Sequence, residues 1–100
     1  MDSGIIYIDP SAANADISKI RSAISKLEES QSSIKKLKAN ADGMQGQTGK
    51  AIQEKCIVLS SQIDSLKTNL NYTIRLIQAA VKEYQEKDRE LAAAIKSGGI

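Results

Sequence analysis

The chain has no histidine, tryptophan or phenylalanine, one cysteine and one proline among its 100 residues. Without histidine, the common metal sites and the Cys/His or Ser/His nucleophile pairs lack a ligand or a base. We therefore expect no catalytic residue, no metal and no cofactor, and the protein is not predicted to be an enzyme. A single thiol, Cys56, also excludes an intramolecular disulfide.

Large side chains and long apolar runs are scarce as well. Aromatic residues make up 3% of the chain, which favours a thin, elongated single domain over a globular core. No stretch approaches the ~20 apolar residues of a membrane-spanning helix, and the run at 4–8 follows Asp2 rather than basic residues, unlike a secretory signal peptide. Fourteen basic and twelve acidic residues are too balanced to imply a nucleic-acid or membrane-surface partner.

The middle of the chain concentrates glycine. Gly43, Gly46 and Gly49 fall within 42–50, whereas 11–41 and 51–97 contain neither glycine nor proline. Apolar residues recur every three or four positions in both of these stretches, which predicts two amphipathic helices. We expect an all-α antiparallel two-helix hairpin with an elongated coiled-coil-like seam: an extended arm at 1–9, helices at 10–41 and 48–97, and a turn at 42–47 that includes Met44.

Local signals mark the ends of these helices. Asp9 can accept N–H bonds from a first turn that begins at Pro10, Thr48 can cap the second helix, and Gly98-Gly99 can end it.

A heptad seam is predicted along each helix. In the first helix it runs through Ala13, Ile17, Ile20, Ile24, Leu27, Gln31, Ile34, Lys38 and Ala41. In the second it is predicted at Ile52, Cys56, Leu59, Ile63, Leu66, Leu70, Ile74, Ile77, Val81, Tyr84, Asp88, Leu91 and Ile95, with Cys56 as a buried apolar thiol. The consecutive steps of four at Leu66, Leu70 and Ile74 predict a stutter that relaxes the supercoil.

Folding the seams together about the turn predicts the register. It pairs Ile34 with Cys56, Leu27 with Ile63, and Ile24 with Leu66, and the first helix then ends opposite about Ala80. Val81, Tyr84, Leu91 and Ile95 would be left without a covering helix. Of these, Val81, Leu91 and Ile95 would form an apolar surface for a partner. A second, broken apolar stripe predicts pairing of hairpins into a four-helix arrangement, as a homodimer or with another protein; it comprises Leu37, Ala51, Ile57, Val58, Leu76, Ala80 and Ala92 to Ala94.

Tyr84 and Asp88 lie four residues apart near the end of the second helix, so a ring and a carboxylate share one face. A lone carboxylate in seam register is costly to bury, and we expect Asp88 to be exposed or paired with a partner's cation.

With this YxxxD pattern, its length, its hairpin plan and the Met44-Gln45-Gly46 turn, the chain resembles the small WXG-type helical hairpins of type VII secretion. The turn keeps the glycine and lacks the family's tryptophan, which favours the firmicute branch that accompanies LXG-domain toxins. The resemblance implies a targeting factor and effector chaperone that binds an LXG-type effector domain or a sister hairpin. It also implies a composite signal, here Tyr84 and Asp88, read by the membrane ATPase of the apparatus. Such a protein is cytoplasmic before export and secreted without a general secretory signal.

Two other functions stay open at this point. A self-assembling needle or filament subunit would also carry a helical seam that continues past the hairpin. An anionic-ligand or nucleic-acid binder could use Lys35, Lys36, Lys38, Lys50 and Lys55 near the turn, but the chain lacks stacking aromatics and overall basicity.

Overall fold

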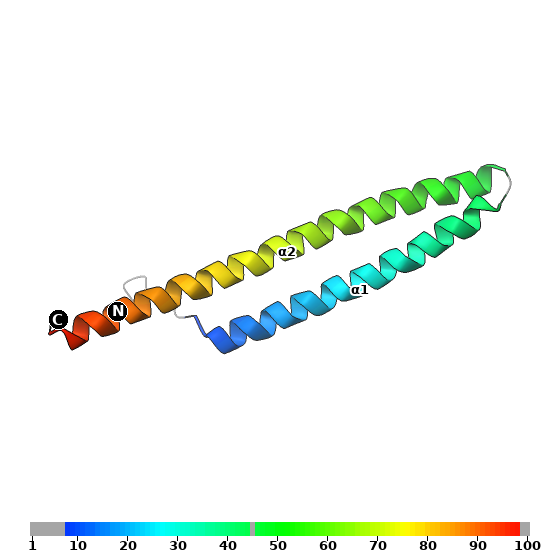
Figure 1. The fold of residues 1–100 in the computed structure, drawn as a ribbon. Coiled ribbons are helices and arrows are strands. Elements are labelled where there is room, and N and C mark those ends of the chain that lie inside the picture. The colour runs from blue at the N-terminus through cyan, green and yellow to red at the C-terminus, as the bar shows by residue number, and fades with distance from the viewer. Residues whose placement is uncertain (1–7, 45, 99–100) are drawn as a thin grey trace, which may run out of the picture.

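The computed structural model describes residues 8–44 and 46–98, and in these ranges the chain forms two long helices joined by a tight turn (Figure 1). Helix α1 spans Pro10–Asp42 and helix α2 spans Gln47–Lys96. They run antiparallel in a rod that measures 79 × 20 × 19 Å. The predicted all-α hairpin is confirmed. Residues 1–7 of the expected arm, Gln45 and Gly99 lie outside the described residues.

Three helix ends were predicted from local residues, and two of these predictions are confirmed. Asp9 caps α1, because its Oδ1 accepts a hydrogen bond of 2.9 Å from the Ser11 N–H, and Pro10 follows as the first helical residue. Gly98 ends α2 with φ of 75°, as expected of a helix terminator. The cap predicted at Thr48 is wrong: α2 begins after Gly46, with no side-chain cap.

The turn depends on two of its glycines for different reasons. Gly46 has φ of 90° and ψ of −169°, a region of backbone space that only glycine enters readily. Gly49 is buried against the end of α1, and a Cβ there would lie 2.7 Å from the Met44 carbonyl oxygen and 3.0 Å from that of Ala41. The close approach of the two helices at this end therefore requires glycine at position 49.

The seam of α2 differs from the predicted one at Leu59 and Leu66, and it includes the half-buried Gln53 next to the predicted Ile52. Ser60 and Lys67 are half-buried, whereas Leu59 and Leu66 are 46% and 45% exposed. With these two residues the inward positions of α2 alternate by three and four without interruption, at Gln53, Cys56, Ser60, Ile63, Lys67, Leu70, Ile74, Ile77, Val81 and Tyr84. The predicted stutter is therefore wrong, and α2 keeps the unbroken heptad repeat of α1.

The register differs by about one helical turn. Lys67 contacts Glu28, and Gln53 donates to Asp42, so residues of α1 face positions about five further along α2 than predicted. Ile24 accordingly lies level with Leu70 rather than Leu66. The start of α1 reaches as far as about Gln85, and it covers more of α2 than the sequence indicated.

The core is a single thin layer. Ala13, Ile17, Ala41, Cys56 and Ile74 are buried, and the other inward apolar residues are half-buried. Cys56 is 2% exposed, which confirms the prediction of a buried thiol. Neither helix, over the described ranges, is apolar enough along its length to cross a bilayer.

Candidate functional site

The two helices differ in length, and α1 therefore does not cover the end of α2. α2 has 50 residues and α1 has 33, so the last turns of α2 continue past the start of α1 (Figure 1). Leu91 and Ile95 lie on this overhang and are 53% and 59% exposed, as predicted. We call residues 84–96, from the last inward position of α2 to its final residue, the open end. Large apolar side chains in contact with water are characteristic of surfaces that bind another macromolecule.

Tyr84 and Asp88 lie on successive turns of the open end. Tyr84 is half-buried, although it was predicted to lack a covering helix, because the shifted register brings the start of α1 level with it. Asp88 is exposed, which agrees with the expectation that this carboxylate does not enter the seam. Their spacing of four residues places them on one side of α2, in line with Leu91 and Ile95. The open end thus combines, on one helical face, an aromatic ring, a solvated carboxylate and two exposed aliphatic side chains.

Val81 does not belong to this exposed surface. It was predicted to lack a covering helix, but it is half-buried, because the shifted register carries α1 past it. The predicted partner-binding surface is consequently reduced to the part of α2 beyond Gln85.

A polar layer, comprising Glu28, Gln31, Ser60, Asp64 and Lys67, interrupts the seam halfway along the hairpin. Gln31 Nε2 donates to Asp64 Oδ1 at 2.7 Å and to the Ser60 carbonyl oxygen at 3.2 Å. Lys67 Nζ donates to Gln31 Oε1 at 2.9 Å and lies 3.7 Å from Glu28 Oε2. Every member has a partner, so the layer fixes one register, in the manner of polar residues at seam positions of coiled coils.

The polar layer was not predicted, although the spacing of residues in the sequence indicates it. Gln31 already fills a gap in the seam of the first helix. A strict alternation traced back from Tyr84 through Ile74 and Leu70 leads to Lys67 and then to Ser60. Leu59 and Leu66 are more apolar than Ser60 and Lys67, and hydrophobicity therefore favoured the two leucines as seam residues.

The predicted turn residues lie at the opposite end of the rod from Tyr84 and Asp88. Gly43, Met44, Gly46 and Gly49 join the helices, and Met44 is 48% exposed at the tip. The structure therefore does not bring the two predicted motifs together; they are separated by most of the length of α2 (Figure 1).

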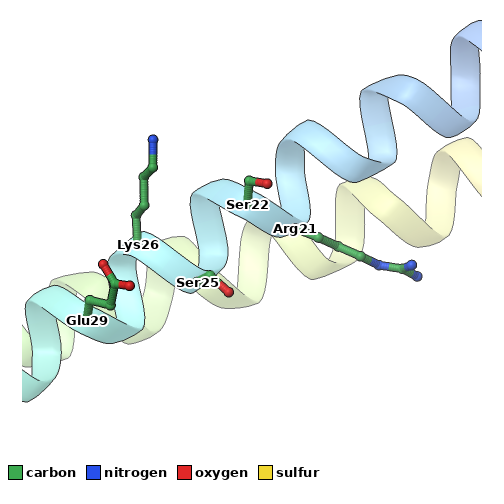
Figure 2. Close-up of a pocket in the computed structure, with 5 residues that line it drawn as sticks. All are labelled: Arg21, Ser22, Ser25, Lys26 and Glu29. Carbon is green, nitrogen blue, oxygen red and sulfur yellow. The ribbon is translucent and has the colours of Figure 1, made fainter.

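The hollow on the surface of α1 shows no converging set of chemical groups. An open hollow on the outer side of α1 is lined by Arg21, Ser22, Ser25, Lys26 and Glu29. Figure 2 shows that the side chains of Arg21 and Lys26 extend in different directions rather than toward a common point. Within the same ranges, no three Cys, Asp or Glu residues gather in a way that could hold a metal ion.

Searches against family models, curated proteins and solved structures find no match for this chain.

Proposed function

We propose that the protein is a small helical hairpin of type VII secretion that binds a helical partner protein and contributes an export signal from its open end. The observation that carries the proposal is the open end of α2, where Tyr84, at its base, shares a face with Asp88 and with the exposed Leu91 and Ile95. The hairpin plan and the resemblance of the YxxxD spacing to the WXG-type hairpins support it.

The open end has the composition that recognition of a protein requires. Leu91 and Ile95 would supply apolar contact area that a partner removes from water. The carboxylate of Asp88, exposed in the free protein, would select a partner with a cation at the matching position. A helix that presents such residues on one face can lie in a groove of its receptor.

The partners proposed are an LXG-type effector domain or a sister hairpin, and the membrane ATPase of the secretion apparatus. The protein would be cytoplasmic until export and would then leave the cell with its partner. In this scheme the hairpin supplies a rigid support, Tyr84 lies at the last inward position of α2, and the overhang keeps Asp88 clear of the seam.

The proposal is tested by export from cells that carry a type VII apparatus. We expect the double variant Tyr84→Ala/Asp88→Ala to accumulate in the cytoplasm together with its partner, while both proteins still fold. The matched control is Tyr72→Ala/Glu90→Ala. It removes an exposed tyrosine and an exposed carboxylate two residues after Asp88, neither of which belongs to the YxxxD pair. Because Tyr84 is half-buried, circular dichroism of the purified variants must show unchanged helicity. Undiminished export of the Tyr84/Asp88 variant would contradict the proposal.

One observation favours a second candidate, a subunit of a needle or filament. An uncovered helix end with exposed Leu91 and Ile95 can also be buried by the next copy in a head-to-tail assembly. This candidate predicts polymers whose mass grows with concentration, and that Ile95→Glu abolishes them. Light scattering across a concentration series separates it from the export hypothesis, which predicts assemblies of fixed size.

A further inference from the structure

The half of α2 nearest the turn carries a second heptad seam beside the one that faces α1. The inward residues that are specific to the observed seam are polar: Gln53, Ser60 and Lys67. The residue before each of them is apolar: Ile52, Leu59 and Leu66. The two seams share a column of positions seven residues apart, which are inward in either case: Gly49, Cys56, Ile63 and Leu70. We call the observed arrangement the polar seam and the alternative the leucine seam.

Leu70 marks the boundary between the two halves of α2. Beyond it the observed seam is already apolar, since Ile74 is buried and Val81 is half-buried. The residues before these two, Thr73 and Ala80, are exposed and would gain less from a place in the seam. By hydrophobicity, the first half of α2 thus favours one orientation and the second half another. Such a conflict between local and global preference is expected at functional or strained positions.

The two seams differ by a small rotation. Neighbouring columns of a heptad repeat lie one seventh of a turn apart, so the leucine seam requires a turn of about 50° of α2 about its own axis. The shared column stays inward, and Gly49 keeps its place against the end of α1. The two steps of four residues from Leu66 through Leu70 to Ile74 would absorb the rotation as a stutter, which relaxes the supercoil locally. The first half of α2 can therefore rotate without separation of the helices.

Side-chain contacts of the polar layer select the polar seam. Gln31 accepts a hydrogen bond of 2.9 Å from Lys67 Nζ and donates one of 2.7 Å to Asp64 Oδ1. Closer to the turn, Gln53 donates to Asp42. Without these contacts, the polar seam would cover Lys67 and leave two leucines, 46% and 45% exposed, in contact with water. The hydrogen bonds of Gln31 therefore make the polar seam the favoured one.

We propose that the polar layer is a latch between these two seams. While Gln31 holds Lys67, Leu59 and Leu66 lie on the surface of the hairpin. When this contact is released, the part of α2 between the turn and Leu70 rotates, the two leucines enter the seam, and Lys67 turns into solvent. The hairpin thereby presents or withdraws an apolar surface. This device goes beyond the proposed function and does not depend on it.

The latch is accessible to other molecules. The side chain of Lys67 is 22% exposed and that of its partner Glu28 is 59% exposed, so a charged group of a second molecule can compete for either. Asp64 is exposed as well. A molecule that contacts Leu59 and Leu66 acts in the opposite sense, because a ligand shifts an equilibrium toward the state that it binds better. The orientation of α2 can therefore be biased in either direction from outside the hairpin.

The rate at which single thiols react with a disulfide reagent tests the rotation. Ser60→Cys in a Cys56→Ala background places a thiol at a half-buried position that would turn outward. Native Cys56, measured in a chain that keeps Ser60, belongs to the shared column and stays inward. Gln31→Leu releases the latch and keeps a residue in the seam of α1.

We expect Gln31→Leu to speed the reaction of the Ser60→Cys thiol at least about tenfold, and that of Cys56 less than about twofold. An unchanged rate for the Ser60→Cys thiol would overturn the proposal. Equal acceleration of both thiols would show that the helices separate rather than rotate, and would overturn it as well.

A variant that exchanges Leu66 and Lys67 provides the matched control. Leu66→Lys/Lys67→Leu places the apolar side chain at the inward position of the observed seam, so release of the latch no longer favours rotation. Added to Gln31→Leu, the exchange should return the rate of the Ser60→Cys thiol to within about threefold of its value in the latched chain. Acceleration that persists in this variant would contradict the rotation, because it would not depend on where the leucine lies. Neither measurement involves export, so the latch and the proposed function can fail separately.

Discussion

Leu66 and Lys67 are neighbours in the sequence, yet the structure turns the charged side chain inward and leaves the apolar one 45% exposed. Lys67 Nζ donates a 2.9 Å hydrogen bond to Gln31 Oε1, and Gln31 in turn donates to Asp64 and to the Ser60 carbonyl. This reversal of the usual preference links two properties of the hairpin: a seam with a fixed register, and a flank with unburied leucines.

The polar layer should contribute measurably to stability through Gln31. Gln31→Ala removes three hydrogen bonds and leaves Lys67 with Glu28 alone, so we expect the free energy of unfolding to fall by about 1–2 kcal/mol. Urea denaturation at a fixed protein concentration measures this loss of unfolding free energy. In a double-mutant cycle with Lys67→Ala, the two changes should couple by roughly 0.5–1.5 kcal/mol. The exposed Gln62→Ala serves as control, and strict additivity of the Gln31 and Lys67 changes would contradict the role assigned to the layer.

Gly49→Ala should destabilise the hairpin at its turn. Its Cβ would lie 2.7 Å from the backbone oxygen of Met44, so the helices must move apart, at a cost of about 1–3 kcal/mol in unfolding free energy. Gly43→Ala is the matched control, since φ there is −83° and the nearest atom to an added Cβ is 3.6 Å away. It should be neutral or should stabilise by about 0.4–1 kcal/mol. Similar thermal midpoints for the two variants would argue against the close approach at Gly49.

Gly46 should tolerate no L-residue, including those that commonly replace glycine in turns. Asparagine relieves strain in the left-handed helical region, but φ of 90° with ψ of −169° lies outside that region. We therefore expect Gly46→Asn and Gly46→Ala to lose the same amount of unfolding free energy, about 1–3 kcal/mol. D-alanine at this position, introduced by chemical synthesis, should leave the stability intact. Rescue of the Gly46→Ala loss by Gly46→Asn would contradict this conformation.

Cys56 should report opening of the hairpin. Because the thiol is 2% exposed in the seam, it can react with a disulfide reagent only after the helices separate. We expect its reaction in the native protein to be at least about a hundredfold slower than in urea, in line with ordinary domain stabilities. A Ser97→Cys chain in the Cys56→Ala background should react rapidly under both conditions. Equal native rates for the two cysteines would show that the seam is open near Cys56.

The sequence was sufficient for the parts of the fold that local chemistry determines. Asp9 with Pro10, and Gly98, mark helix ends through contacts within one turn, and the glycines at 43–49 locate the reversal of the chain. The exposure of Asp88, Leu91 and Ile95 also followed from sequence, because it required only that α2 be longer than α1.

The seam and the register could not be read from one helix at a time. Placing Leu59 and Leu66 in the seam is the better choice for α2 alone by hydrophobicity. Ser60 and Lys67 become favourable only in the presence of Gln31, which lies 29 to 36 residues away in the chain. The same long-range contacts set the register, and an error of one turn there misplaced Val81 among the uncovered residues.

The overhang of α2 also determines which part of the molecule opens first. No residue of α1 faces the last turns of α2, so α1 does not support their backbone hydrogen bonds, and a helix end without packing against a second helix frays readily in water. Amide hydrogens beyond Gln85 should therefore exchange with solvent much faster than those beside the polar layer. Asp88, Leu91 and Ile95 lie on the least protected segment of the rod, and a receptor that binds them would first slow hydrogen exchange there.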